Sequence, residues 1–129
     1  MIQLAAWTYG SLIAVVIVFQ VCLMAGAPWG KLTQGGRVQG ALPVKGRLVA
    51  GFSVLLLAGM AGGILSAAAM PPNWPEWVGW VALLVQALCT LLNWITPSRS
   101  ERLLWGPVTT VMFGLAAYVL LGKVPTLGS

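Results

Sequence analysis

Histidine and aspartate are absent from this chain, and its 129 residues include only two glutamates and two cysteines. Metal sites and most acid–base enzymes depend on histidine and carboxylate side chains, so the composition argues against metal catalysis. Cys22 and Cys89 lie in separate apolar runs without CxxC spacing. We interpret them as thiols within the membrane rather than as a redox pair. An acid–base reaction would have to use Glu76 or Glu101.

Charged residues are also scarce, at 7% of the chain against about 25% in a soluble domain. Apolar residues make up 59% and gather in four long runs, each near the length of a helix that crosses a bilayer. The sequence therefore predicts an all-α fold: a polytopic membrane protein with a four-transmembrane-helix bundle as one domain over 1–129. The predicted spans cover about 4–27, 48–70, 77–95 and 103–121.

The first apolar run has one alternative interpretation, a cleaved signal peptide. It ends in Ala25-Gly26-Ala27, a small-residue pattern typical of a cleavage site. However, no Lys or Arg precedes the run, and the run is longer than the apolar core of a signal peptide. We therefore expect it to be retained as the first helix.

Positive charge is concentrated in alternate loops. The first loop (28–47) carries four cations and the third loop (96–102) carries two, whereas the tails and the second loop together carry only Lys123. The positive-inside rule then places these two loops in the cytoplasm and both termini outside. This rule also accounts for the net charge of +5, and no basic soluble face suggests nucleic acid as a partner.

Tryptophan supports the same boundaries, because this residue prefers the headgroup region of a bilayer. The seven tryptophans fall near the proposed span ends: Trp7, Trp74, Trp77 and Trp80 on one side, and Trp29, Trp94 and Trp105 on the other.

The segment 26–47 is long for so small a protein and contains six glycines, two prolines and four cations. A basic segment at the inner face can bind anionic headgroups, but its cations can equally serve only to set topology. Both interpretations stay open. The glycine spacing lacks the GK[ST] ending of a phosphate loop, and no other motif indicates a cofactor. The candidate headgroup ligands are Lys31, Arg37, Lys45 and Arg47.

Both glutamates have a structural interpretation. Asn73 precedes Glu76 by three residues, and Ser98 precedes Glu101 by three residues. This is the spacing of a capping box, in which each side chain bonds the other residue's backbone N–H. We therefore expect Asn73 and Ser98 to cap the third and fourth helices.

Polar residues inside the spans share one helix face and one half of the membrane. Gln86, Thr90 and Asn93 are spaced i, i+4 and i+7, which aligns them along one side of a helix. Together with Gln20 and Thr110 they predict either interhelical hydrogen bonds or a small polar cavity open to the cytoplasm. No charged residue lies deep in a span, which argues against a proton-coupled carrier.

Small residues recur on the second predicted helix, where Gly59 and Gly63 form a GxxxG pair. Such pairs let helices approach closely. The partner is either another helix of this chain or a second copy of it.

Several local motifs together resemble a family of small four-helix bacterial integral membrane proteins with no assigned activity. They are Gly-Ala-Pro-Trp-Gly at 26–30, Gly-Gly at 35–36, Leu42-Pro43, Arg47, and Ser98-x-Ser100-Glu101-Arg102-x-x-Trp105-x-Pro107-Val108. The resemblance covers most of the chain and implies a bacterial inner-membrane location.

These observations favour a protein without enzymatic activity: an accessory or interaction subunit that binds anionic lipid through 26–47. Its expected partners are membrane lipids and either a second copy or a larger membrane protein. The alternative is a small-solute channel or carrier built around the polar cavity.

Overall fold

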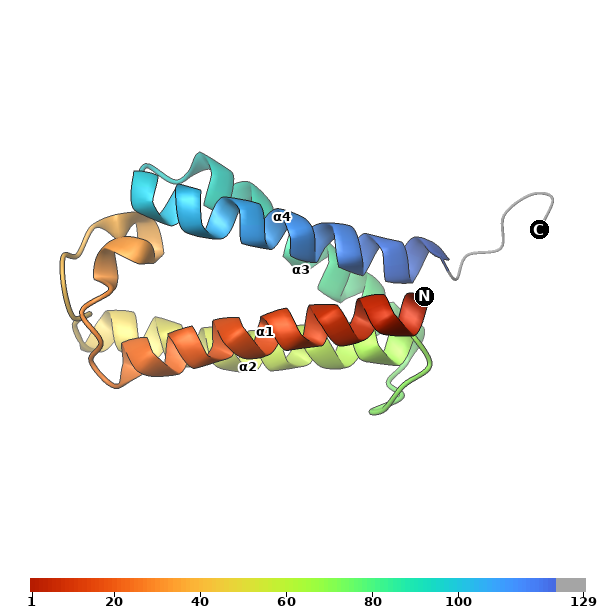
Figure 1. Ribbon diagram of the computed structural model, residues 1–129. Coiled ribbons are helices and arrows are strands. Elements are labelled where there is room, and N and C mark those ends of the chain that lie inside the picture. Colours follow the sequence, from red (N-terminus) through yellow and green to blue (C-terminus); the bar gives the residue numbers. More distant parts are fainter. Residues whose placement is uncertain (123–129) are drawn as a thin grey trace.

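Four helices form the protein in a computed structural model that describes residues 1–122 (Figure 1). They are α1 (Ile2–Met24), α2 (Val44–Ala67), α3 (Glu76–Ile95) and α4 (Arg99–Gly122). Each is long and apolar enough to cross a membrane, and no strand occurs among the described residues. The predicted all-α, four-helix fold is confirmed, and the chain is a multi-pass membrane protein.

Helices α2 and α4 begin before their apolar runs do, at Val44 and Arg99 rather than at 48 and 103. The first helical bonds run from Arg47 N–H to Pro43 O and from Arg102 N–H to Ser98 O, both 3.0 Å. Their first turns contain polar and charged residues, because a helix end at the membrane surface does not have to be apolar. Hydropathy therefore locates the membrane-crossing part of a helix but not its start.

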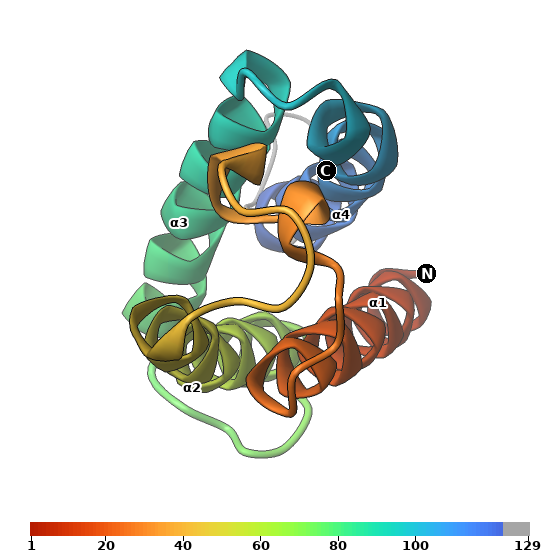
Figure 2. The ribbon, with the colours of Figure 1, turned by 90° about the vertical axis from the view of Figure 1, so that its left-hand side faces the viewer.

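The helices form two antiparallel pairs, α1 with α2 and α3 with α4 (Figure 1). Helices adjacent in sequence pack together, and contacts between α1 and α4 close the bundle. The two pairs converge at the end of the bundle where the N-terminus of the chain lies, and they separate toward the opposite end (Figure 1). Seen from that opposite end, the α1–α2 loop crosses the space between the four helices (Figure 2). We call this the loop end of the bundle.

Small residues allow close packing between α2 and α3. A Cβ on Gly63 would lie 3.0 Å from the backbone oxygen of Val78, and one on Gly79 would lie 3.1 Å from the Ala67 Cβ. Gly63 therefore packs against α3 of the same chain. Gly59, its GxxxG companion, has nothing within 4 Å of an added Cβ. The outward faces of the bundle carry large exposed apolar side chains, among them Val18, Leu55, Leu84 and Val111.

Candidate functional site

The α1–α2 loop is folded onto the start of α4. Two short 3₁₀ turns, η1 (Gly30–Leu32) and η2 (Gln34–Gly36), form its centre. The Gly30 N–H donates to Gly40 O over 2.8 Å and closes the loop on itself. From α4, the Trp105 indole N–H donates to Leu32 O (3.0 Å), and from the residue just before α4 the Ser98 hydroxyl donates to Lys31 O (2.8 Å). Tertiary hydrogen bonds thus satisfy loop carbonyls that would otherwise need water.

The Glu101 carboxylate supplies the third attachment. Its Oε2 accepts a 2.9 Å hydrogen bond from the Gly35 N–H, and only 8% of the residue is exposed. The predicted capping box is therefore half correct. Ser98 Oγ accepts the Glu101 N–H (3.2 Å), but the Ser98 N–H bonds Thr96 Oγ1 rather than the Glu101 carboxylate. The carboxylate instead accepts a backbone N–H from the distant α1–α2 loop, and a local sequence motif carries no information about such a contact.

The predicted cap of α3 by Asn73 is wrong. Pro75 occupies the N-cap position without a side-chain hydrogen bond, and Asn73 has a left-handed backbone conformation (φ 58°). The preceding loop is instead fixed by α2, because Ser66 Oγ accepts the Trp74 N–H over 2.9 Å. The Trp74 ring also lies against Gly62. The Asn73 signal failed because the prolines around it impose a turn of their own.

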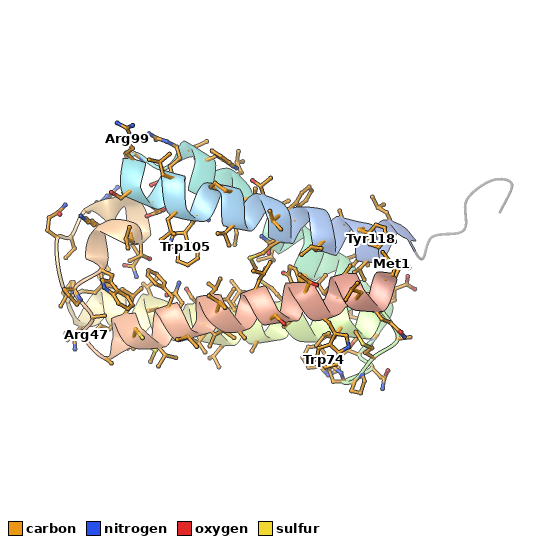
Figure 3. All side chains as sticks on the ribbon, viewed as in Figure 1. Met1, Arg47, Trp74, Arg99, Trp105 and Tyr118 are labelled. Atoms are coloured by element: carbon orange, nitrogen blue, oxygen red, sulfur yellow. The ribbon has the colours of Figure 1, made fainter. Side chains whose placement is uncertain are left out.

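Three aromatic rings meet below the folded loop. Phe19 of α1 stacks on Trp29 with ring centroids 5.7 Å apart and meets the Trp105 ring edge-on at 4.8 Å. Trp105 is directed from α4 toward α1 (Figure 3). Its indole N–H is bonded to the loop, so this tryptophan joins elements of the protein as well as lying near a span end.

Buried hydrogen bonds link the helices deeper in the bundle. The Tyr9 hydroxyl of α1 donates to Gln86 Oε1 of α3 over 2.9 Å, and both residues are almost fully buried. Gln86 Nε2 donates in turn to Thr109 O of α4 (3.3 Å), and the Thr90 hydroxyl lies 3.0 Å from the same oxygen. Gln86 and Thr90 therefore serve as interhelical links, one of the two interpretations that the sequence left open.

A cavity of about 300 Å³ lies at the loop end, between the helices and beneath the folded loop. Of the five polar residues expected at a cavity, Gln20, Gln86 and Asn93 line it. Thr90 and Thr110 are not among its lining residues; the exposed Thr110 hydroxyl accepts the Trp94 indole N–H over 2.7 Å. Five further polar residues line the cavity: Thr33, Gln34, Ser53, Glu101 and Thr109. The sequence gives no sign that Glu101 lines a cavity, because the spacing of a capping box already accounts for this residue.

The six cations of the described residues gather at the loop end. Figure 3 shows Arg47 and Arg99 at this end, whereas Met1 and Trp74 lie at the opposite end of the bundle. Two of the six cations donate hydrogen bonds to backbone carbonyl oxygens. Arg47 Nε donates to Leu42 O, and Arg102 Nη1 donates to Thr96 O, each over 2.9 Å. The other four side chains are exposed: Lys31, Arg37, Lys45 and Arg99. Arg99 thus belongs with the candidate headgroup ligands, whereas Arg47 is partly committed to the loop.

Residues 1–122 contain no group of three or more His, Cys, Asp or Glu side chains placed to hold a metal ion. No protein-family profile, curated protein or solved structure matches the chain.

Proposed function

We propose that this chain is a non-enzymatic membrane protein whose loop end binds the anionic headgroups of one leaflet, as an accessory or interaction subunit. The observation that carries the proposal is the concentration of six cations at one end of the bundle, four of them exposed. Each Lys or Arg close to an anionic bilayer surface contributes about 1 kcal/mol of attraction. Four exposed cations acting together give a strong preference for anionic lipid.

The fixed geometry of the loop supports this role. Bonds from Ser98, Glu101 and Trp105 hold the segment that carries Lys31 and Arg37. A basic segment held in one conformation loses less conformational entropy on binding than a disordered one. Cations that serve only to set topology have no need of such a framework.

The proposed setting is the bacterial inner membrane, with the loop end in the cytoplasm and both termini outside. The distribution of Lys and Arg supports this orientation through the positive-inside rule. The resemblance to small bacterial four-helix membrane proteins supports the location. The cytoplasmic leaflet carries a negative surface potential, which attracts basic segments next to the membrane.

The proposal is tested by lipid retention. The protein is purified in mild detergent with an equimolar mixture of phosphatidylglycerol and phosphatidylcholine, and native mass spectrometry counts the retained lipids. Lys31, Arg37 and Lys45 are changed together to Gln, which leaves the bonded Arg47 and Arg102 in place. The loss of about 3 kcal/mol of attraction predicts a fall of about two orders of magnitude in the affinity for phosphatidylglycerol.

Phosphatidylcholine retention is the internal control, and it should not change. The matched variant is Gln39→Ala, a neutral change at an exposed position in the same loop. Undiminished phosphatidylglycerol retention by the triple variant would leave topology as the sole role of these cations and would refute the proposal.

A further inference from the structure

One oxygen of the buried Glu101 carboxylate has no hydrogen-bond partner among residues 1–122. Oε2 takes the Gly35 N–H, but within the described residues no hydrogen bond reaches Oε1 and no Lys or Arg pairs with the carboxylate. Every fully buried side-chain oxygen in residues 1–122 has a hydrogen-bond partner. Because Oε1 has none, it is not fully buried and has open space beside it. Glu101 is also a lining residue of the cavity. Glu101 thus brings an accessible carboxylate oxygen to the lining of a partly open cavity at the loop end.

Aromatic rings form another part of the same wall. Phe19 and Trp105 both line the cavity and meet edge to face. The face of an aromatic ring attracts a cation lying within about 6 Å of its centre, and the attraction grows when water is excluded. A carboxylate beside aromatic rings is a combination that recognises organic ammonium groups.

The remaining walls are mixed. Apolar side chains from all four helices contribute to the lining, namely Val16, Leu56, Leu57, Met60, Leu92 and Met112. The amides of Gln20 and Asn93 also lie on it, and Gln20 makes no hydrogen bond to any described residue. The site therefore suits a molecule with an apolar body and one polar or charged end.

The volume limits the size of that molecule. An apolar cavity of about 150 Å³ in another protein accommodates benzene. A cavity of about 300 Å³ then holds a ligand of about a dozen non-hydrogen atoms. Lipid acyl chains and large amphiphiles are too big to enter whole.

We infer that this cavity is a binding site for a small organic ammonium cation with an apolar body, whose charge lies against Glu101 and the rings of Phe19 and Trp105. The inference does not rest on the proposed headgroup binding, although Glu101 also holds the loop that carries those cations. The binding site requires a negative charge inside the bundle, whereas the headgroup surface requires positive charges outside it.

The cation nearest the Gly35 turn does not cancel this attraction. Arg37 is the cation nearest the Gly35 turn, where its Nε lies 3.9 Å from the position of an added Gly35 Cβ, but its side chain is exposed. Exposed charges are screened by water and salt. The carboxylate acts from an enclosed position in a lower dielectric, where an interaction with a charge is stronger.

Equilibrium dialysis with radiolabelled benzyltrimethylammonium tests the inference. The full chain is placed in nanodiscs of phosphatidylcholine, so that anionic lipid does not contribute, and empty nanodiscs serve as the blank. Glu101→Gln removes the charge but keeps an oxygen to accept the Gly35 N–H. The matched control is Glu76→Gln, which removes the only other acidic side chain, exposed at the start of α3.

Saturable binding should be at least tenfold weaker in Glu101→Gln and unchanged in Glu76→Gln. Neopentylbenzene, which has the same shape as the probe without its charge, should compete at least tenfold less well against the parent chain. That competition requires no variant, so it remains decisive if Glu101→Gln fails to fold. Absence of saturable binding, equal binding by Glu101→Gln, or equal competition by neopentylbenzene would each overturn the inference.

Discussion

Glu101 Oε2 accepts the backbone N–H of Gly35 over 2.9 Å, across 66 positions of the chain. This bond joins the basic α1–α2 loop to the first turn of α4 and lies at the boundary between the exposed cations and the internal cavity. Hydrogen bonds to a charged group contribute about 1.5–3 kcal/mol. The loop conformation therefore depends on the last helix, and the positions of its charges depend on one carboxylate.

Gly36→Ala should be more damaging than Gly40→Ala. Both glycines have a positive φ (69° and 86°), so alanine costs about 1 kcal/mol in backbone strain at either position. Only at Gly36 would the new Cβ overlap another residue, because it would lie 2.6 Å from Ser98 Cβ. We expect an additional destabilisation of about 1–3 kcal/mol at Gly36, measured by thermal unfolding in detergent. Equal losses would mean that the loop does not pack on Ser98.

Gly63→Leu should disrupt the packing of α2 against α3, whereas Gly59→Leu should be tolerated. A side chain at Gly63 meets Val78 of the same chain, but one at Gly59 meets nothing within 4 Å. The expected cost at Gly63 is about 3 kcal/mol, detected as a lower unfolding temperature. A stable Gly63→Leu variant that loses only self-association would instead assign this glycine to an interface between copies.

Tyr9→Phe should destabilise the bundle by about 1 kcal/mol, because it leaves the buried Gln86 Oε1 without its donor. Tyr118→Phe provides the control, since that side chain is exposed on α4. Unfolding of both variants in the same detergent gives the comparison. An unchanged unfolding free energy in Tyr9→Phe would show that the hydrogen bond between α1 and α3 makes no net contribution to stability.

Reporter fusions test the orientation. An enzyme that is active only in the periplasm should work when fused after Ser129, which lies outside the described residues, and should fail when inserted beside Gln39. The reason is the excess of Lys and Arg in the first and third loops. The reverse pattern would place the loop end in the periplasm and remove the cytoplasmic leaflet as its target.

The helical fold could be predicted because long apolar runs in a membrane admit few alternatives to helices. The helix starts could not, since hydropathy does not register a polar first turn such as the one that begins at Arg99. Helical spacing places Gln86 and Asn93 on one helix face, and Gln20 joins them because it lies in the same half of the membrane.

Glu101 shows the limit of this reasoning. Its spacing from Ser98 matched a local motif, and that motif accounts for the Ser98 hydroxyl but not for the carboxylate. The partner of the carboxylate comes from a distant glycine-rich loop, and sequence spacing carries no information about such a contact. Trp105 is similar, because its bond to Leu32 O depends on how the same loop folds.

The proposed functions of the loop end both require a folded basic loop that Glu101 holds in place. Single cysteines at Thr33, which is buried, and at Gln39, which is exposed, are compared in a chain whose Cys22 and Cys89 are replaced by alanine. A membrane-impermeant thiol reagent is added from the cytoplasmic side. The cysteine at 39 should react at least tenfold faster than the one at 33, and Glu101→Ala should largely remove the difference. Equal reaction rates with Glu101 intact would show that the loop is not folded in this way.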